Sequence, residues 1–186
     1  MNDDFSTAVA IVVTTPVVGG RSEPDLAINS GAVYVFNYDG SQWNLTQKLF
    51  PNDPSSSNFF GTDVSIKGDW LAISAHVPDG GFVYLFKNNS GTWQEEVKFT
   101  ASDNENGDFF GGSIDLDNTR LIVGASFDDE IASNSGSAYI FDLNNGVWSE
   151  TQKLTPDDGA LNDNFGHAVS VHGDRVVVGA FFADAS

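Results

Sequence analysis

The chain contains the same pattern of residues four times. Each copy begins at a Phe and ends fifteen residues later at a Gly or Ala, and the copies are 5–20, 60–75, 110–125 and 165–180. A Gly-x-x-Tyr-x-Phe block follows the first three copies, at 31–36, 81–86 and 136–141, and a Trp follows each block at position 43, 93 or 148. A chain with such a repeat must fold as successive copies of one small unit.

Each repeat shows the pattern of four short strands. Residues 63–66 alternate polar and apolar, whereas 175–178 are almost continuously apolar, as expected of a strand buried on both faces. Turn-forming residues such as Asn144-Asn145-Gly146 separate the later strands. The repeat therefore predicts an all-β fold, a β-propeller built of four-stranded antiparallel blades. A β-sandwich is the alternative, but it does not need such a strict repeat.

The repeat boundaries predict one propeller segment over residues 1–186. We expect blades at about 5–49, 60–99 and 110–154, followed by a half blade at 165–186. About three and a half blades cannot close a ring, so we expect a partial or open propeller. The chain is then a fragment of a longer propeller, or it closes by self-association through its open edges. Residues 1–4 lack the basic start of a secretion signal, so we expect either that the protein is not exported or that these residues are a piece of a longer precursor.

The aligned blocks resemble the FG-GAP repeat, the blade unit of integrin α-subunit propellers and of many bacterial surface proteins. The resemblance rests on Phe-Gly at 60–61, 110–111 and 165–166 and on Val-Gly-Ala at 123–125 and 178–180. The Trp and Lys-Leu of the fourth strand are similar to the bacterial subtype. The resemblance implies an extracellular or cell-surface propeller of about seven blades that binds other macromolecules.

The first and second strands are joined here by tight turns, 67–69 and 172–174, where integrin-type repeats carry a calcium loop. Such a turn has no room for the oxygen ligands of calcium. We therefore do not expect calcium at that position. The first copy also departs from the family pattern, because it reads Phe5-Ser6 and ends in Gly19-Gly20.

Acidic residues dominate the charge of the chain. Its 26 Asp and Glu against 8 Lys and Arg give a net charge of −18, which would repel nucleic acid and anionic membranes. No apolar run approaches the roughly 18 residues of a membrane span, so we expect no membrane insertion. The chain contains no cysteine, which excludes disulfides and thiolate chemistry.

Sixteen of the acids fall in the two kinds of connection that emerge on one face of an antiparallel propeller, together with one base, Arg21. We call this surface the acidic loop face. Its acids in the loops between second and third strands are Glu23, Asp25, Asp79, Asp128, Asp129, Glu130 and Asp184. Those that follow a fourth strand or precede a first strand are Asp3, Asp4, Asp53, Asp103, Glu105, Asp108, Asp157, Asp158 and Asp163. A protein or glycan ligand is the partner we expect on this face.

Two acidic groups are the candidate metal ligands. They are Asp103, Glu105 and Asp108 in one loop and Asp128, Asp129 and Glu130 in another. Clustered carboxylates suit a hard cation, and Ca²⁺ is the cofactor that this pattern would hold. The alternative is a structural or solubilising role. Asp53, Asp103 and Asp158 recur at one repeat position, and such regularity favours structure.

Among the aromatic residues, Trp43, Trp93 and Trp148 are expected to pack between blades, because they recur at one position. Trp70 stands outside this pattern and is the Trp we expect to be exposed. Of the three histidines, only His76 is placed near the acidic loop face.

The sequence contains no catalytic signature, neither a Gly-x-Ser-x-Gly elbow nor His-Glu-x-x-His nor a phosphate-binding glycine loop. We therefore predict no catalytic residues and expect a non-catalytic binding or adhesion module. The alternatives are a polysaccharide-active enzyme built on a propeller and a purely structural spacer repeat of a surface protein.

Overall fold

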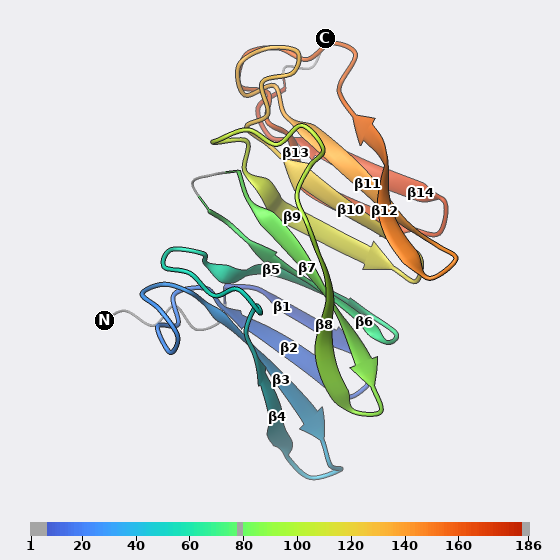
Figure 1. Ribbon diagram of the computed structural model, residues 1–186. Helices are drawn as coiled ribbons and strands as arrows, with labels where there is room; N and C mark the ends of the chain where they lie inside the picture. Colours follow the sequence, from blue (N-terminus) through green and yellow to red (C-terminus); the bar gives the residue numbers. More distant parts are fainter. Residues whose placement is uncertain (1–6, 78–79, 184–186) are drawn as a thin grey trace.

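The computed structural model describes residues 7–77 and 80–183, which fold into four successive antiparallel sheets (Figure 1). Blade 1 contains β1 (Val9–Val12), β2 (Thr15–Gly20), β3 (Ala32–Tyr38) and β4 (Trp43–Leu49). Blade 2 contains β5 (Phe60–Lys67), β6 (Trp70–Ala75), β7 (Phe82–Asn89) and β8 (Thr92–Phe99). Blade 3 contains β9 (Phe110–Asp117), β10 (Arg120–Ala125), β11 (Ser137–Asn144) and β12 (Val147–Leu154). Blade 4 contains β13 (Phe165–His172) and β14 (Arg175–Ala180).

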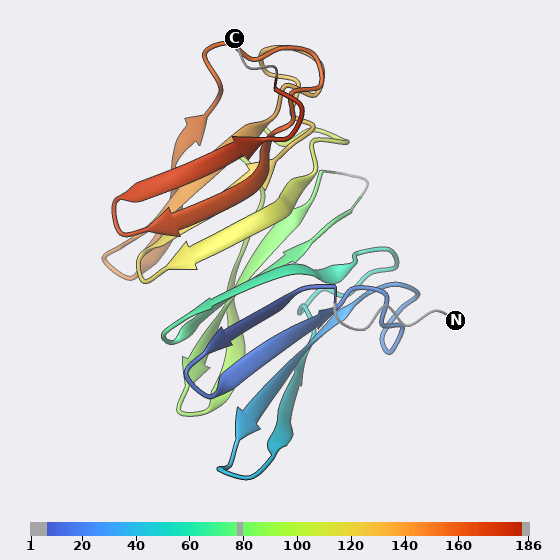
Figure 2. The ribbon, with the colours of Figure 1, turned by 180° about the vertical axis from the view of Figure 1, so that it is seen from behind.

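In every blade the strands pair in chain order, and the blades stack face to face along the molecule (Figures 1 and 2). No helix is present in the described ranges, and none of the sheets closes on itself. The prediction of an all-β, partial propeller is therefore confirmed. No helix of the described residues is long and apolar enough to cross a bilayer. The first-strand residues Phe5 and Ser6 lie outside the described residues.

The hydrophobic cores lie between the blades. Phe60 contacts Tyr84 and Phe86 of its own blade, at ring-centroid distances of 5.3 and 6.0 Å. This aromatic face packs against Val17, Val33 and other buried residues of blade 1. Phe110 repeats the arrangement with Tyr139 and Phe141, at 5.5 and 6.1 Å, against blade 2. Each blade thus has a front face, which carries the aromatic residues and meets the preceding blade, and a back face, which meets the following one.

Phe165 occupies the same place at the start of β13 but is only partly buried. Its backbone forms the same bridge to the preceding blade, with Gly136, that Phe60 forms with Gly31. The difference arises because blade 4 contains no third strand in the described part of the chain, so no Tyr or Phe covers the ring.

A β-bulge in the fourth strand of each complete blade changes the face of the sheet on which the later side chains lie. The register between third and fourth strands shifts at Val35/Phe36, Leu85/Phe86 and Ile140/Phe141. Because side chains alternate along a strand, an extra residue moves the later ones to the other face. Trp93 therefore packs in the core with blade 1, whereas Val97, after the bulge, packs in the core with blade 3.

The innermost strands of neighbouring blades are joined by side chains instead of a shared backbone ladder. Oδ2 of Asp63 in β5 accepts a hydrogen bond from the Ile114 amide in β9 at 2.9 Å. Oδ2 of Asp115 in β9 accepts one from the Val171 amide in β13 at 2.8 Å. Burial raises the pKa of Asp63, although its hydrogen bonds oppose this. These carboxylates are thus structural links near the inner edge of the blades.

Glycine is required at the start of the third strand. Gly31 has φ +80°, and a Cβ there would lie 2.1 Å from the carbonyl oxygen of Phe60 in the next blade. Gly136 repeats this with φ +83° and 2.0 Å to the carbonyl oxygen of Phe165. A side chain at either position would both strain the backbone and force adjacent blades apart.

Trp70 is not the exposed tryptophan, so that prediction is wrong. Its ring packs edge-on against Trp148 of blade 3 with centroids 5.5 Å apart, and Lys87 lies over it. Trp43 is the exposed one, with 51% of its surface accessible, whereas Trp93 and Trp148 are buried as expected. The repeat position of Trp43 is the same, but the described residues include no blade before blade 1 that could cover it.

Candidate functional site

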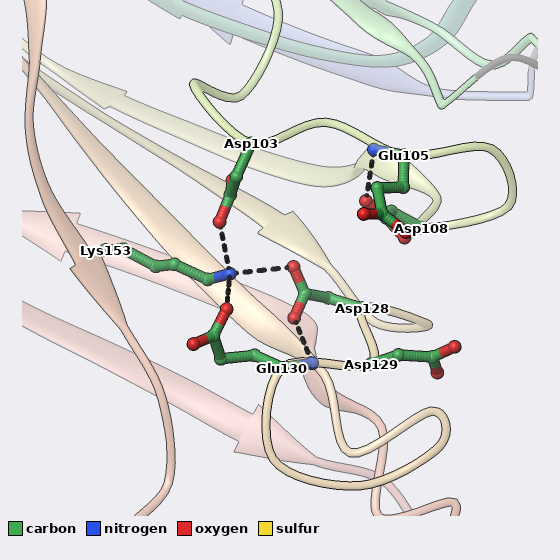
Figure 3. Close-up of a pocket in the computed structure, with 7 residues that line it drawn as sticks. All are labelled: Asp103, Glu105, Asp108, Asp128, Asp129, Glu130 and Lys153. Atoms are coloured by element: carbon green, nitrogen blue, oxygen red, sulfur yellow. Dashed lines mark hydrogen bonds and ion pairs between the residues drawn. The ribbon is translucent and has the colours of Figure 1, made fainter.

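The six predicted metal-ligating residues come together in one pocket. Asp103, Glu105 and Asp108 approach from the β8–β9 loop, and Asp128, Asp129 and Glu130 approach from the β10–β11 loop. The pocket has a volume of about 170 Å³, and Lys153 of β12 completes its lining (Figure 3). The two loops lie together because the connections after second and fourth strands emerge at the same end of antiparallel sheets.

Lys153 lies where three of the carboxylates converge (Figure 3). Its Nζ is 2.6 Å from Oδ2 of Asp103, 3.0 Å from Oδ2 of Asp128 and 3.0 Å from Oε2 of Glu130. Burial alone would lower the pKa of the ammonium, but the hydrogen bonds to these carboxylates outweigh it and raise the pKa. Lys153 is therefore a charged counter-ion at the centre of this half of the pocket.

Tyr139 contacts two of the three carboxylates that Lys153 contacts. It is the register partner of Lys153 in the β11–β12 pair. Its Oη lies 2.9 Å from Oδ1 of Asp103 and 2.8 Å from Oδ2 of Asp128. Burial and the two neighbouring carboxylates raise the pKa of this phenol, so Tyr139 stays a neutral hydrogen-bond donor.

Asp128 is the most deeply buried of the group, with 5% of its side chain exposed. Its Oδ1 accepts hydrogen bonds from the Glu130 amide and the Ser137 hydroxyl, both at 2.9 Å. Burial would raise the pKa of Asp128, but the hydrogen bonds from Glu130, Lys153 and Tyr139 together lower it. Asp128 thus organises its own loop as well as the pocket.

The Tyr–Lys–carboxylate arrangement recurs in the other complete blades. In blade 2 the register partners Tyr84 and Lys98 contact Asp53 at 3.1 and 2.7 Å. In blade 1 the equivalent Lys48 lies 3.2 Å from Glu23 and 2.6 Å from Asp25, and Tyr34 hydrogen-bonds to Glu23. The recurrence of Asp53 and Asp103 is thus explained by a structural role. Asp158, the third member of that series, is exposed.

The three remaining carboxylates line the side of the pocket away from Lys153 (Figure 3). Oδ2 of Asp108 accepts a hydrogen bond from the Glu105 amide at 2.7 Å, and Oδ1 of Asp129 accepts one from the Asn134 amide at 2.6 Å. Burial raises the pKa of Asp108, and repulsion from Asp128 and Glu105 adds to this. This side of the pocket therefore carries an excess of negative charge.

The carboxylates that converge in the pocket, those of Asp103, Asp128 and Glu130, do so around the ammonium group of Lys153. Among the described residues, no group of three or more His, Asp or Glu side chains has an arrangement that could hold a metal ion. Calcium binding by Asp103, Glu105, Asp108, Asp128, Asp129 and Glu130 stays a prediction.

The expected charge of the acidic loop face needs correction. The sequence placed one base, Arg21, among sixteen acids, but Lys48, Lys98 and Lys153 reach the loops from the ends of their strands. Assigning charges by loop left these three lysines out because they lie in strands. Each lysine recurs at one repeat position and pairs with a Tyr, and this recurrence could have predicted their place on the face. Asp3, Asp4, Asp79 and Asp184 lie outside the described residues.

A cluster of rings that sequence reasoning missed lies between blades 2 and 3 at the start of β9. The His76 and Phe109 rings are 4.2 Å apart, and Phe109 lies 5.4 Å from Phe127, which is 43% exposed. Burial lowers the pKa of His76, and the charge of Arg21 adds to this, so His76 stays neutral at physiological pH. The three residues occupy different repeat positions, so the repeat could not reveal them.

The stacked four-stranded blades define this chain as a segment of a β-propeller. The family model for the FG-GAP repeat matches residues 43–86, 93–141 and 148–186. The chain belongs to the FG-GAP repeat family. Each match begins at the Trp of a fourth strand and continues into the following blade, and the first three strands of blade 1 lie outside the matches. No curated protein matches the chain. FG-GAP repeats are typical of extracellular or surface proteins, where they are typically non-catalytic binding or adhesion modules.

Proposed function

We propose that this chain is a non-catalytic binding module of an extracellular or cell-surface protein and that it contacts a protein ligand through the acidic loop face. Membership of the FG-GAP repeat family supports the location and the binding role. The geometry that supports the choice of face is the pocket between the β8–β9 and β10–β11 loops.

The observation that carries the proposal is the imbalance of charge in this pocket. Six carboxylates line it, and Lys153 is the one basic side chain among its lining residues. Lys153 contacts Asp103, Asp128 and Glu130, which leaves Glu105, Asp108 and Asp129 on the opposite side. Such a surface steers and binds a cationic partner.

The size of the pocket favours a protein over a glycan. A volume of about 170 Å³ is well below the roughly 300–1,000 Å³ of sites that enclose a whole small molecule. It suits the tip of one Lys or Arg side chain that projects from a larger partner. The ligand we propose is therefore a protein with a basic surface.

The proposal is tested by measuring the binding of a lysine-rich peptide to the full chain by surface plasmon resonance. The informative variant carries Glu105→Gln and Asp129→Asn, because both changes remove charge while the Asn keeps the acceptor for the Asn134 amide. We expect affinity to fall roughly tenfold and the salt dependence to become weaker. Asp174→Asn is the matched control, because Asp174 is 94% exposed and belongs to the β13–β14 turn at the opposite end of the blade.

The other two interpretations predict different results. A spacer repeat would show no saturable binding of the peptide. A polysaccharide-active enzyme would release reducing ends from a glycan panel, and that activity would fall in the Glu105 and Asp129 variant. Either outcome, or equal binding by the variant and the wild-type chain, contradicts the proposal.

A further inference from the structure

A second pocket lies between blades 1 and 2, on the side of their outer strands β4 and β8 (Figure 1). Both blades have all four strands in the described part of the chain. The pocket has a volume of about 650 Å³, within the roughly 300–1,000 Å³ of sites that enclose a small molecule. We call it the outer pocket. It shares no lining residue with the acidic pocket between the β8–β9 and β10–β11 loops, so it is a separate site.

Leu49 leaves space in the outer pocket that an aromatic ring occupies in the next interface. The counterpart of Leu49 in blade 2 is Phe99, whose ring lies 4.7 Å from the ring of Phe141 in blade 3. Leu49 and Phe86, which is the counterpart of Phe141, both line the outer pocket. Because a Leu side chain is smaller than a Phe ring, the interface between blades 1 and 2 has room for a ligand at this place.

Phe50 is an aromatic residue that the repeat does not require. Blades 2 and 3 have Thr100 and Thr155 at its repeat position, so a blade packs without a ring there. Phe50 lines the outer pocket and is half-buried. Nζ of Lys48 lies 5.4 Å from the centroid of its ring, a contact that helps to orient the ring. Phe50 is therefore an accessible apolar surface that only this interface has among the three complete blades.

Polar groups of β8 and of the loop after β4 also line the outer pocket. Oε1 of Gln94 accepts a hydrogen bond from Asn89, and Oε2 of Glu95 accepts one from the Asn52 amide at 2.8 Å. Within residues 7–77 and 80–183, no hydrogen bond is found for Nε2 of Gln94, for Oε1 of Glu95 or for the Asn52 side chain. The lining thus offers a ligand both donors and acceptors.

The outer pocket carries no excess of charge. Among the described residues that line it, Lys48 and Glu95 are the charged ones, and their charges are opposite. Lys48 also forms ion pairs with Glu23 at 3.2 Å and with Asp25 at 2.6 Å. The pocket therefore has no field that would select an anion or a cation, in contrast to the acidic pocket.

We propose that the outer pocket binds a neutral oligosaccharide, which goes beyond the proposed binding of a basic protein. A sugar ring has apolar C–H groups on its faces and hydroxyl groups at its edge, and each hydroxyl both donates and accepts hydrogen bonds. Phe50 suits the faces, and the open groups of Gln94 and Glu95 suit the hydroxyls. A wholly apolar ligand would bury those polar groups without partners, which is costly.

Isothermal titration calorimetry of the full chain with maltohexaose, cellohexaose and N-acetylchitohexaose tests the proposal. We expect saturable binding of at least one of these sugars. Phe50→Thr installs the residue type of blades 2 and 3 and is expected to weaken that binding roughly tenfold. Phe50→Tyr retains the ring and is expected to bind as the wild-type chain does. Leu49→Phe copies Phe99 and is expected to block binding because its ring fills the pocket.

Two further variants separate sugar binding from general effects. Gln94→Leu keeps the size of an exposed side chain but removes its hydrogen-bonding groups, so sugar binding is expected to weaken roughly threefold to tenfold. Phe127→Thr is the matched control, because it also removes a partly exposed ring, but in the β10–β11 loop. It is expected to bind the sugar as tightly as the wild-type chain. Circular dichroism checks the fold of every variant.

Three results would overturn the proposal. The first is the absence of binding for all three sugars at concentrations up to roughly 10 mM. The second is equal sugar binding by Phe50→Thr and the wild-type chain. The third is a decaproline peptide that binds more tightly than any of the sugars and loses affinity in Phe50→Thr, because the pocket then takes an extended peptide. Binding of the lysine-rich peptide should be unchanged in Phe50→Thr, so the two proposals fail independently.

Discussion

Gln47 of blade 1 binds both backbone groups of Trp93 in blade 2. Its Nε2 donates to the Trp93 carbonyl oxygen at 2.8 Å, and its Oε1 accepts from the Trp93 amide at 2.9 Å. The side chain thus replaces a backbone partner across the gap between the outer strands of two sheets. Trp93 is buried, so these two groups have little access to water.

Replacement of Gln47 should therefore destabilise the chain. Gln47→Ala leaves a buried amide and carbonyl without partners and is expected to lower the free energy of unfolding by about 1–3 kcal/mol. Chemical denaturation followed by tryptophan fluorescence measures the change. Gln152, the equivalent residue of blade 3, is exposed, and Gln152→Ala should change stability by less than about 0.5 kcal/mol. An equal decrease in the free energy of unfolding for the two variants would contradict the role given to Gln47.

The burial of the fourth-strand Trp depends on the neighbouring blade. Trp93→Ala should lower the free energy of unfolding by about 3–5 kcal/mol, because it empties part of the core between blades 1 and 2. Trp43→Ala, measured at a concentration where the chain is monomeric, should lower it by less than about 1 kcal/mol. Similar losses at the two positions would show that Trp43 is covered in the monomer.

Lys153 should contribute more to stability than its counterpart in blade 2. Lys153→Met removes the counter-ion of three carboxylates and is expected to lower the free energy of unfolding by about 1–3 kcal/mol. Lys98 pairs with the half-exposed Asp53, so Lys98→Met should change it by about 0–1 kcal/mol. Thermal unfolding at neutral pH compares the two. The assignment fails if the Lys98 variant is the less stable.

The calcium prediction can be tested with the same variant. If the ammonium of Lys153 occupies the centre that a cation would need, Ca²⁺ should raise the melting temperature of Lys153→Met more than that of the wild-type chain. Differential scanning calorimetry with and without Ca²⁺ measures this, and NaCl at the same ionic strength serves as the control. A wild-type response as large as that of the variant would instead indicate calcium at carboxylates that Lys153 does not contact.

The ion pair between Arg120 and Asp142 should make stability depend on pH in the acid range. Arg120 donates to both carboxylate oxygens of Asp142, at 2.6 and 3.1 Å. These hydrogen bonds lower the pKa of Asp142 below its ordinary value of 3.8. The pair therefore contributes fully above pH 3.8, and its contribution is lost as the pH falls through the lowered pKa of the folded state.

Asp142→Asn should consequently be less stable than the wild-type chain at neutral pH, by about 1–3 kcal/mol, and the difference should narrow below pH 3.8. Urea unfolding over a pH series measures it. Asp174→Asn, at an exposed position of blade 4, is the control variant and should change the free energy of unfolding by less than about 0.5 kcal/mol at neutral pH. If the difference in the free energy of unfolding between Asp142→Asn and the wild-type chain stays the same at every pH, the ion pair is not the cause of the lost stability.

Much of the fold could be predicted because its determinants are local and repeated. Tyr84 and Phe86 lie two residues apart in one strand, and that spacing alone places both side chains on one face of the sheet. The tight turns and alternating patterns set the strands for the same reason. The six carboxylates of the candidate site were also found, because antiparallel connectivity alone brings their loops to one end of the blades.

What escaped prediction depends on neighbours outside the repeat or on a shift within a strand. Lys153 reaches the pocket because it pairs in register with Tyr139 beyond the bulge in β12, and residue type alone does not reveal that direction. Trp43 is exposed because no blade among residues 7–77 and 80–183 packs over it, and its own repeat position cannot show this. The packing of Trp70 on Trp148 likewise joins two different repeats.

Gly31 and Gly136 hold neighbouring sheets at backbone-to-backbone distance. Gly81 makes the same approach between blades 2 and 3, where a Cβ would lie 2.0 Å from the Phe110 carbonyl oxygen, although the β6–β7 loop before it is shorter than the β2–β3 and β10–β11 loops. The contact between sheets therefore does not depend on the length of the adjoining loop. Insertions on this side of the blades can diversify what the molecule recognises while the contact at the glycine stays the same.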